Sequence, residues 1–297
     1  MTLAIAWRSE GRIHLASDSR IKLGQGQFAD IGIKVLGLPI IVSDTRGTAP
    51  GISIIFQSTY GFGYAGSLVN AGTFAELMGE LLQHVQFLQE TQKFSFVAVC
   101  DFVVEYCSQI TTAVCSFMLQ HGSYEFFLTG LCPQTQSIRA AHFQFEHSPL
   151  TAQAQAKYQE ILKADGEFVA IGTGAAAAEK RIKEVGLKPI LLAINEVIDS
   201  KEVDSVGGDL QYGSFDKSAR FVVSGFIRRS FEKLEHEGTP YGPQEQRIFR
   251  YRGFQMYDGW DPLAKALWAT PSFIEIDVPS NEDSVKHFRR RLGLPNL

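Results

Sequence analysis

The 297-residue sequence contains little that would point to metal, disulfide or cofactor chemistry. It has four cysteines and no CxxC pair, and three of the four fall in one expected helix, so we expect free thiols in a reducing compartment. These cysteines are Cys100, Cys107, Cys115 and Cys132. The seven histidines form no HExxH or comparable ligand spacing, and His14 is expected to be an ordinary strand side chain. The sequence therefore predicts neither a metal nor a cofactor.

Long apolar runs and strong charge are also missing. No run approaches the roughly 18 residues that a membrane span needs, and Arg8, Glu10 and Arg12 interrupt the region where a signal peptide would be apolar. The formal net charge of −4 provides no basic excess for nucleic acid or an anionic membrane. The GxSxG and GxxxxGK motifs are absent. We therefore expect a cytoplasmic protein whose partners are neither nucleic acids nor membranes.

The sequence does contain strand and helix patterns, and they come in blocks. Gly11 separates two short apolar runs, residues 2–8 and 12–18, which is typical of a hairpin. The remaining patterns predict strands at 52–57, 61–65, 124–130, 138–145, 168–171, 210–213 and 221–223, and helices at 68–90, 96–119, 175–185 and 190–198. Blocks of each type, rather than βαβ alternation, favour an α+β fold with sheets stacked beneath helices.

The C-terminal part of the chain differs in composition from the rest. From about residue 227 it is richer in charge, proline and aromatic residues, and residues 286–291 are basic. A solvated helix face explains such a basic run better than an acidic partner. We therefore predict one domain over residues 1–225 and a C-terminal extension over residues 226–297, which serves in oligomerisation or packing.

Three residues near the N-terminus stand 16 positions apart: Thr2, Asp18 and Lys34. Once Met1 is removed, a threonine at the start of the chain supplies a hydroxyl nucleophile and an α-amine that can take its proton. An α-amine titrates near roughly 7.7–8.0, so it can act as a base close to neutral pH. A nearby lysine disfavours the protonated amine, and an aspartate keeps that lysine charged and oriented. The trio predicts hydrolysis by an N-terminal nucleophile.

A second motif offers a different chemistry. The segment GlyThrGlyAlaAlaAla, residues 172–177, follows the strand predicted at 168–171 and opens a helix. A GxGxxA turn in this position can seat a pyrophosphate on the helix N-terminus, and Asn195 or Glu196 lies near where a ribose-binding acid would be sought. No βαβ unit precedes it, which weakens this interpretation.

The opening pattern ThrLeuAlaIle, followed by GlyArgIleHisLeuAlaSerAspSerArg and GlyIleLysVal, resembles the proteasome β-type family of N-terminal nucleophile hydrolases. Three later segments continue the resemblance over about residues 2–225: TyrAlaGlySerLeu at 64–68, GlyThrGlyAla at 172–175 and AspSerValGlyGly at 204–208. The resemblance implies a four-layer αββα sandwich, which agrees with the order of the predicted blocks.

The resemblance also implies roles for individual residues. Thr2 would be the nucleophile and its own amine the base, while Lys34 would tune that amine and Asp18 would orient Lys34. The backbone N–H of Gly66 would stabilise the tetrahedral oxyanion, where removal of one donor typically lowers the rate about 10²–10³-fold.

Four further positions can be compared with the family pattern. Thr173 replaces a serine and keeps a hydroxyl that would hydrogen-bond toward the Thr2 amine, and Asp204 matches the family's second aspartate. Gly207 stands where the family has serine, so one hydroxyl is missing there. Tyr64 is expected near the floor of the specificity pocket, where its bulk would favour small substrate side chains.

These observations lead to three hypotheses. The first is a threonine-type peptidase or amide hydrolase that acts on peptides or unfolded proteins without a cofactor, as a homo-oligomeric ring or stack with an ATP-dependent unfoldase as a possible partner. The second is a non-catalytic proteasome-like scaffold subunit, suggested by Gly207 and the aromatic tail. The third is a non-peptide acylase, because a fold does not fix its substrate.

Overall fold

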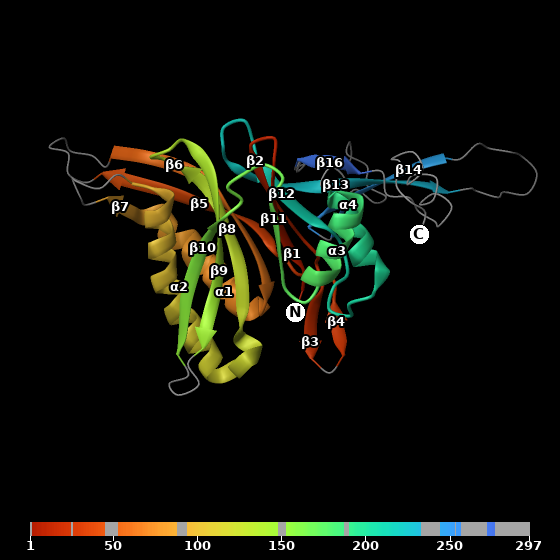
Figure 1. The fold of residues 1–297 in the computed structure, drawn as a ribbon, viewed down its shortest axis with the longest axis horizontal. Helices are drawn as coiled ribbons and strands as arrows, with labels where there is room; N and C mark the ends of the chain where they lie inside the picture. The colour runs from red at the N-terminus through yellow and green to blue at the C-terminus, as the bar shows by residue number, and fades with distance from the viewer. Residues whose placement is uncertain are drawn as a thin grey trace, which may run out of the picture.

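A computed structural model describes residues 2–24, 26–44, 53–87, 94–147, 153–186, 190–232, 244–252, 254–256 and 272–276. Within these residues the protein has mixed α/β structure, with two large sheets and four α-helices (Figure 1). The helices are α1 (Leu68–Leu81), α2 (Phe96–Met118), α3 (Ala175–Val185) and α4 (Ile190–Ser200). In Figure 1, α1 and α2 lie on one side of the molecule and α3 and α4 on the other.

The first sheet begins with the predicted hairpin. Its strands, in spatial order, are β11 (Phe168–Ile171), β1 (Ala4–Ser9), β2 (Arg12–Ser17), β12 (Gln211–Phe215), β13 (Phe221–Glu232), β14 (Gln244–Tyr251) and β15 (Phe254–Met256), and β16 (Phe273–Ile276) pairs with β13. Glu10 and Gly11 connect β1 to β2, both with positive φ, as a tight hairpin turn requires. The hairpin prediction is confirmed, and so is the strand at 168–171.

The second sheet contains a strand that the sequence pattern divides in two. The order is β10 (Ala154–Ile161), β9 (Ser137–His147), β8 (Tyr124–Cys132), β6 (Ser53–Gly66), β5 (Val35–Asp44) and β7 (Val85–Phe87). The separate strands predicted at 52–57 and 61–65 are the single strand β6. Gly61 does not break it: a Cβ there would lie 2.5 Å from the Phe221 ring, so the glycine permits close packing between the sheets.

The helix predicted over 68–90 is wrong in its second half. α1 begins at the N-cap Ser67, whose side chain accepts from the backbone N–H of Asn70, and ends at Leu81. The chain then forms a 3₁₀ turn (Leu82–His84) and the strand β7, which runs parallel to β5. The buried face of α1 contains Phe74 and Met78, whereas Leu77 is exposed.

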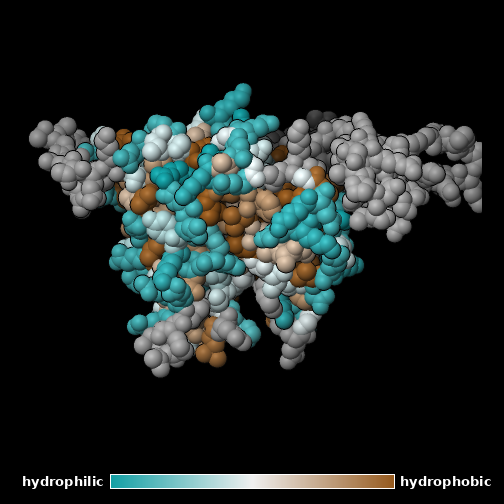
Figure 2. All heavy atoms as spheres, in the orientation of Figure 1, coloured by the Kyte–Doolittle hydropathy of each residue, from teal (hydrophilic) through white to brown (hydrophobic). Residues whose placement is uncertain are grey.

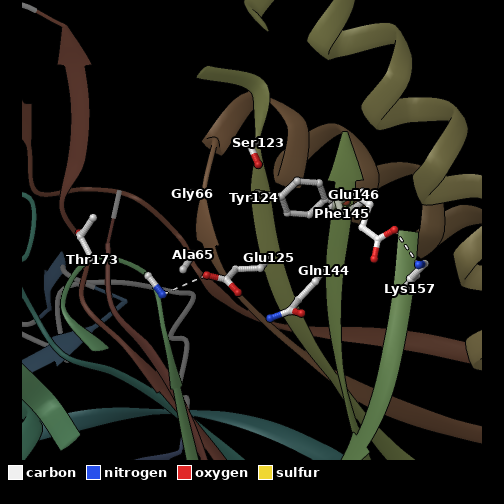
Figure 3. Close-up of a pocket in the computed structure, with 11 residues that line it drawn as sticks. Ala65, Gly66, Ser123, Tyr124, Glu125, Gln144, Phe145, Glu146, Lys157 and Thr173 are labelled. Carbon is white, nitrogen blue, oxygen red and sulfur yellow. Dashed lines mark hydrogen bonds and ion pairs between the residues drawn. The ribbon is translucent and has the colours of Figure 1, made fainter. Parts of the chain in front are cut away.

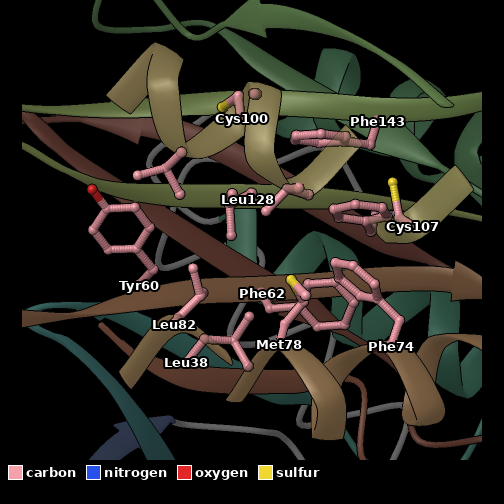
Figure 4. Packing of buried hydrophobic residues seen from close by; sticks show 14 of the residues in the cluster. Leu38, Tyr60, Phe62, Phe74, Met78, Leu82, Cys100, Cys107, Leu128 and Phe143 are labelled. Carbon is pink, nitrogen blue, oxygen red and sulfur yellow. The ribbon is translucent and has the colours of Figure 1, made fainter. Parts of the chain in front are cut away.

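A large apolar cluster joins α1 and α2 to the second sheet (Figure 4). Phe62 lies at its centre, with ring centroids 5.1 Å from Phe126 and 5.6 Å from Phe74. The buried residues of α2, including Cys100 and Cys107, recur at three- and four-residue steps on one helix face. By length and composition alone α2 is long and apolar enough to cross a membrane, and its packing against the sheet buries 28% of the apolar window.

Alternation along β1 places the first sheet between two further apolar clusters. Leu3, Ile5 and Trp7 pack with α3 and α4 in one cluster. Ala4 and Ala6, on the opposite face of the strand, belong to a cluster that contains residues of both sheets. Because β1 is covered on both faces, its start is held in a buried environment.

The two-stranded ribbon β3 (Ile21–Gly24) and β4 (Gln27–Ala29) completes the described strands. At the other end of the chain, β13 runs without interruption across residues 225 and 226, where the sequence predicts a domain boundary. The described strands β14, β15 and β16 extend the first sheet from β13. The described part of the C-terminal extension is therefore continuous with this sheet.

Candidate active site

The structure brings Thr2, Asp18 and Lys34 together at one end of the first sheet. Thr2 precedes β1, Asp18 follows its hairpin partner β2, and Lys34 immediately precedes β5 of the second sheet. The Thr2 hydroxyl is hydrogen-bonded to Asp18 Oδ1 and accepts from Lys34 Nζ. Lys34 Nζ lies 2.8 Å from Asp18 Oδ1, and all three residues are buried.

Backbone donors converge on the carboxylate of Asp18. Oδ1 accepts from Leu3 N at 3.0 Å, and Oδ2 accepts from Arg20 N and Gly207 N, each at 3.1 Å. Together with Lys34, these backbone N–H groups satisfy both oxygens of the buried carboxylate. Asp18 thus has a fixed position between the Thr2 hydroxyl and the chain segment that contains Gly207.

Lys34 is positioned from both of its ends. Nζ also donates to Arg20 O at 2.5 Å, while the backbone N–H of Lys34 donates to Gln211 Oε1 at 2.9 Å. Gln211 in turn donates to Gly32 O. Burial lowers the pKa of Lys34, although Asp18 opposes this shift. A lysine with a lowered pKa exchanges its proton more readily near neutral pH than an exposed one.

Gly207 is explained by Arg20, which fills the space that a side chain at position 207 would need. The Arg20 guanidinium makes a bidentate contact with Asp30, at 2.8 and 2.9 Å, and donates to the carbonyls of Asp204 and Val206 at 3.2 and 3.3 Å. A Cβ on Gly207 would lie 2.2 Å from Arg20 Cζ. The departure from serine therefore accompanies an arginine that closes this side of the site.

The hydroxyl predicted at Thr173 has a different partner from the expected one. Thr173 Oγ1 lies 2.7 Å from Ser205 Oγ, not toward the start of Thr2. Ser205 was not identified from the sequence, although it lies only two residues before Gly207. Asp204 is exposed, and its backbone carbonyl accepts a hydrogen bond from Arg20 at 3.2 Å. The structure therefore does not bring the Asp204 side chain to Thr2.

The GxGxxA turn between β11 and α3 packs against Thr2. Gly174 N donates to Thr2 O at 3.3 Å, and a Cβ on Gly172, whose φ is +87°, would lie 2.1 Å from that oxygen. β11 pairs with β1 in the antiparallel direction, so this turn is not part of a βαβ unit. Contact with Thr2 accounts for Gly172, and a Cβ on Gly174 would lie 2.7 Å from Val206 and 3.0 Å from Leu3, so packing explains both glycines without a pyrophosphate. Among the described residues, no group of three or more His, Cys, Asp or Glu side chains could hold a metal ion.

A cavity of about 520 Å³ opens beside the trio (Figure 3). It is lined by Ala65, Gly66, Ser123, Tyr124, Glu125, Gln144, Phe145, Glu146, Lys157, Gly172 and Thr173. Gly66 ends β6 with a φ of +123°, and a Cβ there would lie 2.6 Å from Tyr124 Cα. The structure thus places Gly66 and Thr173 on one cavity wall.

Tyr64, which the sequence places near the floor of a specificity pocket, is not among the residues that line this cavity. Its ring packs in the core beside Phe62, and its hydroxyl donates to Ile33 O at 3.0 Å. Successive side chains of a strand point to opposite faces, and β6 places Tyr64 on the helix side.

Comparison with known proteins gives a fold and no closer assignment. No family model matches the chain, and no curated protein matches its sequence. Among solved structures, the chain is similar to Anbu, the ancestral β-subunit, from Yersinia bercovieri, with 16% identity and a TM-score of 0.51 over 72% of this chain and 81% of that one. It is also similar to a Gly-1 mutant of Anbu from Hyphomicrobium sp. strain MC1, with 17% identity and a TM-score of 0.51 over 83% of this chain and 87% of that one. At these identities the likeness shows the fold alone.

Proposed function

We propose that this chain is an N-terminal nucleophile hydrolase of the proteasome β type, most simply a threonine peptidase that cleaves peptides or unfolded proteins. The observation that carries the proposal is the buried contact of the Thr2 hydroxyl with both Lys34 Nζ and Asp18 Oδ1. A nucleophile, a group that lowers the proton affinity of its neighbours and an orienting carboxylate within hydrogen-bond reach are what this chemistry requires. The fold of Anbu and the three apolar clusters, which fit a four-layer αββα sandwich, support it.

The reaction follows from the groups at the start of the mature chain. After removal of Met1, the Thr2 amine takes the hydroxyl proton while Oγ1 attacks the substrate carbonyl carbon. The negative charge on the carbonyl oxygen is stabilised by backbone N–H donors, for which Gly66 is the proposed source. Collapse breaks the C–N bond, the leaving amine takes the proton, and an ester to Thr2 remains. Water then hydrolyses this ester and restores the free hydroxyl.

Two observations favour a second candidate, a non-catalytic scaffold subunit with the same fold. Thr2 is buried and is not among the residues that line the cavity, and Arg20 occupies the place of a serine side chain at position 207. Such an arrangement also suits a chain that is retained for assembly. In either case we propose a homo-oligomer in the cytoplasm, and size-exclusion chromatography with light scattering would test the oligomer.

Treatment with a β-lactone or an epoxyketone, followed by intact-mass measurement, tests the proposal directly. A chain that lacks Met1 and gains one inhibitor mass supports the enzyme. Thr2→Ala should lose both the adduct and the hydrolysis of a fluorogenic peptide panel, and Thr2→Ser should keep measurable hydrolysis because it keeps a hydroxyl. Retention of Met1 with no adduct would overturn the enzyme and favour the scaffold. Cleavage of acyl amides but not of peptides would point to an acylase.

A further inference from the structure

The cavity beside Gly66 and Thr173 contains the side chain of Glu125 on β8, which stands opposite Ala65 on β6. Tyr124 and Phe145 also border the cavity, but their rings pack 4.8 Å apart in the helix-side cluster, on the other face of the second sheet. Glu125 projects from β8 into the same space, and Figure 3 shows its carboxylate between Ala65 and Gln144. The proposed hydrolysis uses none of these side chains, so their chemistry needs another explanation.

Glu125 is held in place and charged. Its Oε1 accepts from Gly172 N at 3.3 Å, and its Oε2 lies 3.1 Å from His142 Nε2. Burial opposes ionisation, but the hydrogen bond from His142 and the other donors outweigh it, so the pKa of Glu125 is lowered. One third of the side chain remains exposed, which leaves the carboxylate accessible from the cavity. A fixed and accessible carboxylate of this kind attracts a cation.

The other charges at the cavity compensate one another. Glu146 and Lys157 form an ion pair at 2.6 Å across β9 and β10, and both side chains are more than half exposed. This pair therefore forms a neutral rim. Glu125, whose ion-pair partner is His142, is the remaining charged side chain among the described residues that line the cavity.

Gly172 connects this cavity to the proposed nucleophile. Its N–H donates to Glu125, and its Cα packs so closely on Thr2 O that a Cβ would lie 2.1 Å away. Ala65 lies on the same contact, 2.9 Å from that Cβ position. Gly172 therefore lines the cavity and contacts Thr2 at the same time.

We propose that this cavity binds a lysine or arginine side chain of the substrate, close to the bond that Thr2 attacks, with Glu125 as the specificity-determining residue. The cationic head of the basic side chain pairs with the exposed part of the carboxylate. The inference rests on the proposed function for the identity of the ligand as a polypeptide substrate. The binding site itself is testable without any hydrolysis.

The test uses fluorescein-labelled alanine pentapeptides that carry lysine, norleucine or glutamate at one position, titrated into the full-length Thr2→Ala protein by anisotropy. Lysine should bind roughly tenfold more tightly than norleucine, the effect of one charge-assisted hydrogen bond, and glutamate should bind most weakly. Glu125→Gln, which keeps an acceptor for Gly172 N, should remove the preference for lysine. Glu76→Gln makes the same charge change on the exposed side of α1 and should leave the preference intact.

The possible results distinguish failure of the cavity proposal from failure of the hydrolase proposal. Equal binding of lysine and norleucine peptides, or a preference that survives Glu125→Gln, would overturn the inference. Glu125-dependent lysine binding by a wild-type protein that cleaves nothing would support the cavity and refute the hydrolase. Peptide cleavage that ignores charge in both wild type and Glu125→Gln would support the hydrolase and refute the cavity. An unchanged urea midpoint for Glu125→Gln excludes unfolding as the cause.

Discussion

Replacing Asp18 with asparagine should destabilise the fold by removing the partner of a buried lysine. Asp18 and Lys34 have side chains that are 0% and 4% exposed, and they lie 2.8 Å apart. Removing one member of such a pair typically costs about 3–5 kcal/mol, because the remaining charge is buried without compensation. Backbone N–H donors point at both carboxylate oxygens of Asp18, and asparagine offers only one oxygen. We therefore expect a loss of about 3–5 kcal/mol in the free energy of unfolding at pH 7.

The stability difference between wild type and Asp18→Asn should also depend on pH in a definite direction. Burial lowers the pKa of Lys34, and Asp18 is the group that opposes the shift. Without Asp18 the pKa falls further, so the folded variant binds fewer protons than its unfolded state, in which lysine titrates near about 10.4. Stability rises with pH wherever the unfolded state binds more protons. The gap between wild type and Asp18→Asn should therefore narrow from pH 7 to pH 9.

Urea unfolding, followed by tryptophan fluorescence at both pH values, measures this effect. Asp204→Asn is the matched control: it makes the same substitution at an exposed residue, and we expect a change within about 0.5 kcal/mol. The same variant tests whether the Asp204 side chain contributes to the site. Because that side chain is exposed and does not reach Thr2, we expect Asp204→Asn to leave peptide hydrolysis unaffected. A loss below about 1 kcal/mol for Asp18→Asn, or a gap that widens with pH, would refute the ion-pair reasoning.

Two further predictions concern residues around the site. Gly207→Ala should lower the unfolding free energy by about 1–2 kcal/mol, because its Cβ would lie 2.2 Å from Arg20 Cζ and displace the Asp30 contact. In an Arg20→Ala background the same change should be nearly neutral, and additive losses in the double-mutant cycle would contradict the steric explanation. His14 stacks on Trp7 and lies 2.8 Å from the Tyr212 hydroxyl, and burial lowers its pKa below the ordinary 6.5. Its protonation therefore opposes folding, so stability should fall as the pH drops below about 6.5. In His14→Phe the thermal unfolding midpoint should fall less between pH 7 and pH 5 than in the wild type. An equal fall in both proteins would show that His14 is not the cause.

The elements that the sequence predicted well have local signals. The Gly11 hairpin, the strand at 168–171 and the helix at 175–185 are each marked by residues within the segment itself. The sequence pattern does not predict the strand β10, because its inward-facing residues include Ala154 and Ala156, whose small side chains hide the alternation. The end of α1 was missed because apolar residues continue at helical spacing into β7, whose pairing with β5 overrides local propensity.

The site shows the same division between local and distant information. Thr2, Asp18 and Lys34 could be placed together from strand ends, since each borders β1, β2 or β5. Ser205 and the Arg20 guanidinium could not, because their roles depend on tertiary contacts: Ser205 meets Thr173, 32 residues away, and Arg20 meets Asp204 and Val206, 184 and 186 residues away. From the sequence alone, Gly207 indicates only a missing hydroxyl. The structure shows that the Ser205 hydroxyl contacts Thr173 and that Arg20 fills the space beside Gly207.

The proposed catalytic trio and the proposed specificity residue lie on different strands. The trio borders β1, β2 and β5, whereas the charged side chains of the cavity, Glu125, Glu146 and Lys157, come from β8, β9 and β10. The two sets meet at Gly172, which contacts Thr2 on one side and donates to Glu125 on the other. A positive φ and the lack of space for a Cβ fix glycine at this junction. We therefore expect changes at Glu125 to alter the proposed substrate preference without moving Thr2, because Gly172, which contacts both residues, is also held by its close packing on Thr2.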